Sequence, residues 1–188
     1  MNRELANLIY DNLKEISKVF SDYQSNVNLP CPPGCGKCCF NAEVSCSPYE
    51  LLPLAYHLMD SGIAEEVLEK ASLPTSGICL FLDVKESSLG LGSCGQYEHR
   101  PFICRAFGLT ARKGKNGRID RTFCKVLNQE LLSSSHLQII DDEIPLIDVW
   151  KKRLESIDPH LLEKEVPIHQ AIVIILEKIL LIKKYSEQ

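Results

Sequence analysis

Four cysteines within nine residues constrain this chain more than any other feature of its sequence. They lie in the segment 31–39, which reads Cys-Pro-Pro-Gly-Cys-Gly-Lys-Cys-Cys. Proline and glycine interrupt helices and strands, so the segment is predicted to be a tight loop whose thiols can converge on one point. A loop of this composition buries little apolar surface. A thiolate-bound metal would stabilise it, because the free energy of metal binding then becomes free energy of folding.

The other five cysteines also lie in the first two-thirds of the chain, at Cys46, Cys79, Cys94, Cys104 and Cys124. Nine cysteines in 188 residues are about 5% of the chain, below the roughly 8–10% of a disulfide scaffold. Their odd number also argues against a closed set of disulfides. The first 20 residues carry charges every few positions and lack the apolar stretch of a signal peptide. We therefore expect a cytoplasmic protein with reduced thiols, a setting in which cysteine clusters usually bind metals or catalyse reactions.

The spacing of the cysteines leaves the metal open. A zinc ribbon uses two closely spaced cysteine pairs, and only the first is present here, because the later cysteines stand alone. Neighbouring side chains rarely point the same way, so Cys38 and Cys39 are expected to bind different metals or one polynuclear cluster. Iron–sulfur clusters also combine a close run of cysteines with a distant one. Iron, an iron–sulfur cluster and zinc all remain candidates, in one or two centres. Cys46, on an apparent short strand, is interpreted as a buried apolar residue.

Three motifs carry a resemblance to a known family. They are Cys31-x3-Cys35-x2-Cys38-Cys39, then Cys79-Leu-Phe-Leu-Asp83, then Cys94-Gly-Gln-Tyr97-Glu98-His-Arg100-Pro101-Phe-Ile-Cys104-Arg105. Together they resemble the YkgJ-like cysteine-cluster family, described as zinc- or iron-chelating domains or as iron–sulfur-cluster-containing proteins. A related cluster occurs in flagellin lysine N-methylases. The resemblance implies eight metal ligands: Cys31, Cys35, Cys38, Cys39, Cys79, Cys94, Cys104 and Cys124. Cys46 departs from the pattern.

Two arginines of the third motif, Arg100 and Arg105, are candidates for contact with the cofactor. Guanidinium groups beside several thiolates would offset negative charge and donate hydrogen bonds to sulfur. The alternative is that both arginines form ordinary ion pairs at the surface. Tyr97 belongs to the same motif and completes the candidate cofactor-binding set. None of the five histidines has ligand spacing to another, and His99 is the one nearest to the motif.

Positive charge is concentrated around the last cysteines. Residues 97–125 hold 8 basic and 2 acidic side chains, although the whole chain has a net charge of −4. This island is interpreted as compensation for buried thiolates together with a solvated hairpin, and an anionic partner is the alternative. Nucleic-acid binding is not expected, because the rest of the chain is acidic.

The fold is predicted to be mainly α with a small antiparallel β element. We expect a single domain over 1–188, with a metal-binding core at 31–124 wrapped by helices in the remainder, 1–30 and 125–188. Apolar periodicity and the capping box Ser47–Glu50 predict helices over 3–23, 48–61, 63–72, about 125–135 and from 145 onwards. Strand-like runs predict hairpins that pair 78–83 with 90–94 and 107–112 with 118–123, the second around an Asn-Gly turn, and a short strand is expected within 41–46.

The last predicted helix, 168–184, is apolar on more than one face. Glu177 and Lys178 interrupt it, so no apolar run approaches the roughly 18 residues that a membrane span needs. The helix is expected to be buried against the domain's own helices, including 3–23, which offers a matching apolar stripe. The alternative is a homodimer seam.

These features predict a cysteine-ligated metal-binding protein whose metal is structural and could also be redox-active. The alternative, implied by the resemblance, is an enzyme in which an iron–sulfur centre supports group transfer such as protein lysine N-methylation. The sequence contains no dinucleotide-binding glycine motif, no P-loop and no G-x-S-x-G motif. A protein partner or a small molecule is expected, and neither its identity nor a catalytic residue follows from the sequence.

Overall fold

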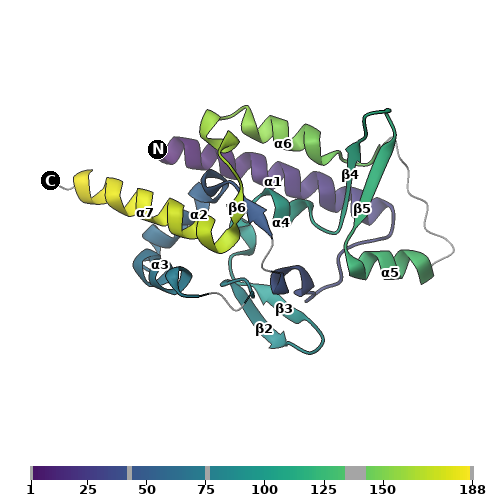
Figure 1. Cartoon of the computed structure of the whole chain (residues 1–188), viewed down its shortest axis with the longest axis horizontal. Helices are drawn as coiled ribbons and strands as arrows, with labels where there is room; N and C mark the ends of the chain where they lie inside the picture. Colours follow the sequence, from purple (N-terminus) through teal and green to yellow (C-terminus); the bar gives the residue numbers. More distant parts are fainter. Residues whose placement is uncertain (1, 42–43, 75–76, 134–142, 187–188) are drawn as a thin grey trace.

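The computed structural model describes residues 2–41, 44–74, 77–133 and 143–186. The α-helices are α1 (Arg3–Asn26), α2 (Leu52–Asp60), α3 (Ala64–Ser72), α4 (Phe102–Ala106), α5 (Lys125–Ser133), α6 (Ile147–Glu155) and α7 (Ile168–Ser186). Short 3-10 helices are η1 (Lys37–Phe40), η2 (Pro48–Leu51), η3 (Tyr97–His99) and η5 (Pro159–Leu162). The strands are β1 (Ser45–Cys46), β2 (Leu82–Glu86), β3 (Leu91–Cys94), β4 (Leu109–Lys113), β5 (Ile119–Phe123) and β6 (Val166–Pro167). The fold is thus mainly α with small antiparallel sheets, as predicted (Figure 1).

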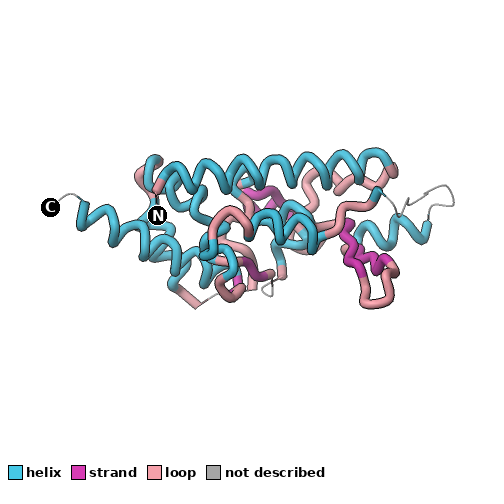
Figure 2. The backbone as a smooth tube through the Cα atoms, turned by 90° about the horizontal axis from the view of Figure 1, so that it is seen from above, coloured by secondary structure: helices cyan, strands magenta, loops and turns pink. Residues whose placement is uncertain are grey.

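Helix α1 runs along one side of the molecule (Figures 1 and 2). It begins at Asn2, whose side-chain oxygen accepts the Leu5 N–H at 2.9 Å. Its buried stripe has the helical spacing seen in the sequence and packs against α2, α4 and α6. The stripe comprises Ala6, Ile9, Leu13, Ile16, Phe20 and Tyr23.

Helix α7 is buried against the chain's own helices, but its neighbours differ from those expected. It packs on α3, η2 and α2. The helix at 3–23, which was expected among its neighbours, is not one of its main contacts, and α2 packs against both helices. Its buried residues are Ala171, Ile172, Ile175, Leu176 and Ile179. Lys178, one of the two charged residues that interrupt the apolar run of this helix, has a structural role, because its Nζ donates a hydrogen bond to the Tyr49 hydroxyl at 2.8 Å. The C-terminal end of the helix projects past the rest of the chain (Figures 1 and 2).

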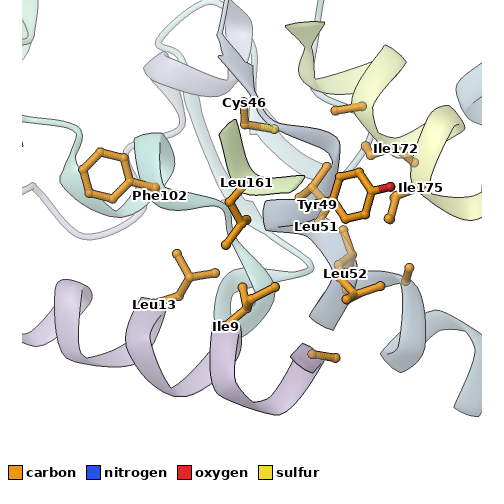
Figure 3. Packing of buried hydrophobic residues seen from close by; sticks show 14 of the residues in the cluster. Ile9, Leu13, Cys46, Tyr49, Leu51, Leu52, Phe102, Leu161, Ile172 and Ile175 are labelled. Atoms are coloured by element: carbon orange, nitrogen blue, oxygen red, sulfur yellow. The ribbon is translucent and has the colours of Figure 1, made fainter. Parts of the chain in front are cut away.

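The main hydrophobic core lies where α1, α2, η2, α4 and α7 meet (Figure 3). Figure 3 shows the Cys46 side chain among apolar residues of this core, where its exposed fraction is 1%. Burial raises the pKa of this thiol well above its ordinary value. Cys46 is therefore a buried residue of the core, as interpreted from the sequence. A smaller cluster under β4 and α5 contains Tyr23, Leu29, Leu109 and Leu127.

The two predicted hairpins are present, with shifted ends. In the first, Leu82 pairs with Cys94, and β2 begins later than predicted. The reason is that residues 79–81 form a turn, in which the Leu82 N–H donates a hydrogen bond to the Cys79 carbonyl at 3.0 Å. In the second, Leu109 pairs with Phe123, and Gly117 turns the chain at a φ of +78°. That left-handed conformation is the reason glycine suits the turn.

Other boundaries differ from the sequence pattern in smaller ways. The strand expected within 41–46 is the two-residue strand β1, which pairs with β6, a partner that the local pattern did not predict. Residues 42–43 lie outside the described residues, as do the last two residues of the helix predicted over 125–135. Among the described residues, every helix is too short or too polar to cross a lipid bilayer.

Candidate metal centre

Eight of the nine cysteines line a single cavity of about 1300 Å³. They come from the loop before and within η1, from both sides of the β2–β3 hairpin, from α4 and from the residue before α5. They are Cys31, Cys35, Cys38, Cys39, Cys79, Cys94, Cys104 and Cys124, the same eight that the family resemblance implies. Cys46 lies apart in the hydrophobic core, and all nine thiols are free of disulfide bonds.

The cysteine loop lies against the β2–β3 hairpin, which holds its thiols in the cavity wall. Cys35 forms an isolated antiparallel bridge with Leu91. The Gly36 N–H donates to the Gly90 carbonyl and the Gly92 N–H donates to the Gly34 carbonyl, both at 3.0 Å. A Cβ atom on Gly92 would lie 2.7 Å from the Asp83 carbonyl oxygen, so glycine is required for this close approach.

A further backbone hydrogen bond sets the position of Cys79. Its N–H donates to the Cys39 carbonyl at 2.8 Å. Because Cys94 pairs with Leu82 across the hairpin, Cys79 and Cys94 are both fixed relative to the loop by backbone hydrogen bonds. Backbone contacts thereby fix cysteines from three separate stretches of the chain, the loop 31–39, Cys79 and Cys94, relative to one another.

Cys104 is positioned by a buried carboxylate that the sequence motif did not include. Glu50 accepts the Ser47 N–H through Oε1 at 3.1 Å and the Phe102 N–H through Oε2 at 2.9 Å. The first contact is the Glu50 half of the predicted capping box. The second caps the start of α4, two residues before Cys104. Burial raises the pKa of Glu50 to about 7.

The two motif arginines have different surroundings. Arg105 is buried, and its guanidinium donates to the Arg100 carbonyl at 2.6 Å, to Ser17 Oγ at 2.8 Å and to the Glu98 carbonyl. Desolvation lowers its pKa to about 10. Every described hydrogen bond of Arg105 thus goes to a protein oxygen, and the side chain holds the loop 98–100 against α1.

Arg100 interacts electrostatically with several of the thiols. Its guanidinium stacks 3.5 Å above the centre of the Tyr97 ring, and its Nε donates to the Tyr97 carbonyl at 3.1 Å. Its positive charge acts to lower the pKa of Cys38, Cys94 and Cys104. The aromatic stack holds the cation in place.

Cys38 and Cys39 do not diverge, contrary to expectation. Their sulfur atoms are 3.9 Å apart, because both residues lie in the tight turn η1, where successive side chains differ by about 120° rather than alternating. The hydrogen bond from Cys39 is the main cause that lowers the pKa of Cys38 to about 6, and the same contact raises the pKa of Cys39.

Electrostatic interactions link the thiols of the cavity in two overlapping sets. The pKa of Cys31 is raised to about 11, first by desolvation and then by Cys35, Cys38 and Cys124. The pKa values of Cys79, Cys94 and Cys104 are also raised, first by desolvation, and the charge of Cys38 raises all three further. The charge of Cys94 also raises the pKa of Cys79 and of Cys104. Cys39 is affected by Cys38, Cys79 and Cys104. We name the first set the Cys31 group (Cys31, Cys35, Cys124) and the second the Cys104 group (Cys39, Cys79, Cys94, Cys104). Cys38 interacts with both.

The thiols are spread around the cavity wall rather than gathered at one point. Within the ranges that the structure describes, no three His, Cys, Asp or Glu side chains lie close enough together to hold one ion as they stand. The donor set nevertheless fits a thiophilic metal, because soft thiolates select zinc, iron and iron–sulfur clusters. Two histidines that the sequence set aside, His99 and His169, also line the cavity. His99 stacks on His57 with ring centres 4.2 Å apart, and burial lowers its pKa.

Comparison with known proteins agrees with this donor set. The CxxCxxCC family model, described as "Putative zinc- or iron-chelating domain", matches residues 30–129, which include all eight cysteines of the cavity. No curated protein and no solved structure matches the chain. The match covers more than half of the chain, and the chain therefore belongs to the CxxCxxCC family, the YkgJ-like cysteine-cluster family that its sequence motifs resemble.

Proposed function

We propose that this protein binds metal through eight cysteine thiolates arranged as two adjoining centres. The observation that carries the proposal is the location of the cysteines. Eight line one cavity, and the ninth, Cys46, is buried in the hydrophobic core. Eight sulfurs exceed the four ligands of one tetrahedral ion or of one cubane cluster. Two tetra-thiolate centres follow if Cys38 completes the Cys31 group beside the four members of the Cys104 group.

The surroundings of the cavity support a structural role for the metal. The loop 31–39 contributes no fully buried apolar side chain, and it is held by a few backbone hydrogen bonds to the hairpin. Metal binding would join this loop, the hairpin, α4 and the start of α5 into one unit, and its free energy would stabilise the fold. Arg100 would offset part of the negative charge of the thiolates.

Purification without oxygen followed by elemental analysis tests the proposal. We expect at least two metal ions per chain, and Cys94→Ser should lower this content. The matched control is Cys46→Ser, which changes a cysteine outside the cavity and should leave the content unchanged. A brown protein that bleaches on reduction would identify iron–sulfur clusters, whereas a colourless protein containing zinc would identify a structural zinc protein. A folded wild-type chain with less than one metal per molecule would refute the proposal.

A second candidate function is group transfer at an iron–sulfur centre. The observation that favours it is the cavity volume of about 1300 Å³, which exceeds the range of about 300–1,000 Å³ typical of small-molecule pockets and leaves space beyond the thiols. Such an enzyme needs a metal position that an outside molecule can reach. Cyanide added to the reduced, iron-loaded protein should then change its electron paramagnetic resonance spectrum. An unchanged spectrum would indicate metals saturated by protein sulfur and would exclude this candidate.

A further inference from the structure

A second, smaller cavity of about 300 Å³ adjoins the cysteine cavity and is lined by four cationic side chains. Lys14 and Lys18 come from α1, and Arg100 and Arg105 come from the loop and helix around α4. Both arginines line the cysteine cavity as well, so the two cavities are neighbours. Neither the cysteine motifs nor the metal proposal gives this smaller cavity a role.

The sequence of α1 explains why polar groups face this cavity. Lys14 is three residues from Ser17 and four from Lys18, and Ser21 is four residues from Ser17 and three from Lys18, so the four side chains lie on one face of the helix. The apolar stripe of α1 faces the core instead. This face presents two ammonium groups, which only donate hydrogen bonds, and two hydroxyls, which can also donate. An oxyanion accepts from both kinds of group.

The cationic groups of this cavity are only partly neutralised by the protein. Lys18 forms an ion pair with Asp22, but Lys14, Arg100 and Arg105 have no carboxylate within ion-pair distance in the described part of the chain. Glu98 is the acidic side chain in the lining, where it acts to raise the pKa of Arg105. The lining therefore carries more positive than negative charge.

Arg105 retains donors for a ligand although it is buried. Its described hydrogen bonds use three of the five guanidinium N–H groups, and Arg100 uses one of its own. The Ser17 hydroxyl accepts from Arg105, so its own hydrogen remains available to donate. Arginine, lysine and hydroxyl donors thus surround one small volume from α1 on one side and from the α4 region on the other.

We propose that this cavity binds the phosphate group of a small molecule. A phosphate dianion has several oxygens and suits cations that approach from two sides, whereas a carboxylate would be satisfied by one bidentate arginine. The volume lies at the low end of ligand pockets, which fits a compact molecule rather than a polymer. Since Tyr97, Arg100 and Arg105 also line the cysteine cavity, the remainder of the ligand would extend toward the thiols.

Calorimetric titration of the metal-loaded, full-length protein with inorganic phosphate at low ionic strength tests this proposal. We expect saturable binding that the double variant Lys14→Ala/Lys18→Ala weakens by at least about tenfold. Both lysines are exposed, so the variant should keep its fold and metal content. The control is Lys70→Ala. Lys70 is also exposed and, like Lys18, forms an ion pair with an acidic residue four positions away on its own helix, so this variant should bind phosphate like the wild type.

A variant that binds phosphate more tightly shows that changes in binding are not caused by misfolding of the variants. Glu98→Gln removes the negative side chain of the lining but keeps the backbone carbonyl that accepts from Arg105, and it should strengthen phosphate binding by about threefold or more. Parallel titration with glycerol 1-phosphate separates two sources of the group. Tighter binding than inorganic phosphate indicates an esterified ligand, and equal binding indicates free phosphate.

Three results would overturn the proposal. One is the absence of saturable phosphate binding by the wild-type protein, and another is equal binding of acetate at matched ionic strength. The third is phosphate binding that persists in Lys14→Ala/Lys18→Ala and disappears when the metal is removed, since phosphate would then be a ligand of the metal. Metal content is measured for every variant, so failure of the two-centre metal proposal would be seen separately from failure of phosphate binding.

Discussion

The carboxylate of Glu50 accepts the N–H of Phe102 at 2.9 Å, which joins two segments that are 52 residues apart. Through its other oxygen the same side chain accepts the Ser47 N–H. One buried residue therefore caps both η2, in the hydrophobic core, and α4, which carries Cys104. The position of a candidate metal ligand thus depends on a group that belongs to the core and has no thiol beside it in the sequence.

The pH dependence of stability should report on Glu50. Burial raises its folded-state pKa from 4.5 to about 7, so the unfolded chain releases the proton first and stability falls as pH rises between these values. Between pH 5 and pH 8 this loss should be about 2–3 kcal/mol. In Glu50→Gln the loss should disappear, and urea unfolding at both pH values measures it.

Two controls make the Glu50 test specific. Glu66→Gln changes an exposed carboxylate and should retain the wild-type pH profile. Glu50→Ala leaves two buried N–H groups without their acceptor and should be less stable than Glu50→Gln at every pH, by about 1–3 kcal/mol. A Glu50→Gln profile that matches the wild type would show that Glu50 is ionised at both pH values.

Gly92→Ala should disturb the attachment of the cysteine loop. The new Cβ would lie 2.7 Å from the Asp83 carbonyl oxygen and 2.8 Å from Leu82 Cδ1, so the hairpin must open. We expect a loss of about 1–3 kcal/mol in the free energy of unfolding together with a lower metal content. Gly95→Ala is the control, because its Cβ would meet nothing closer than 3.6 Å. Equal effects of the two variants would contradict the close-approach argument.

The two thiol groups predict different partial losses of metal. Cys124→Ser should empty the centre of the Cys31 group and spare the other, whereas Cys104→Ser should do the reverse. Each variant is therefore expected to retain about half of the wild-type metal, and the double variant almost none. Elemental analysis after purification without oxygen measures both. Complete loss of metal from either single variant would indicate one polynuclear centre instead of two.

Local chemistry explains what the sequence predicts well. The Glu50 half of the capping box, the Asn-Gly turn at Gly117 and the stripe of α1 depend on residues within a few positions of one another, and each is present. The cysteines that line the cavity were identified through the family resemblance, because their spacing alone does not say which distant loops meet. Chemistry and resemblance together thus pointed to the thiols and left their arrangement undetermined.

Contacts between distant segments explain what the sequence did not predict. The bond from Phe102 to Glu50 and the pairing of β1 with β6 join residues that share no local pattern. The proximity of Cys38 and Cys39 follows from a 3-10 turn, whose geometry the proline and glycine signals did not specify. Likewise, apolar periodicity indicated that α7 is buried but not which helices cover it, because several helices offer a suitable apolar face. In the structure α2 and α3 pack against α7.

The burial of α7 leads to a prediction about Ile175, whose side chain is 1% exposed. Replacement by Asp would bury a carboxyl without a partner at the junction of α7 with α2 and η2, at a cost on the order of 4 kcal/mol or more. The variant should unfold or aggregate, as seen by circular dichroism and size-exclusion chromatography. The control is Ile182→Asp on the same helix, where the side chain is 39% exposed and the substitution should leave the fold intact. A folded, monomeric Ile175→Asp protein would show that this face of α7 is a surface for a partner.

The control variant also tests the alternative of a homodimer seam. A change from dimer to monomer in Ile182→Asp would place that seam at the projecting end of α7, where Leu181 and Tyr185 are also exposed.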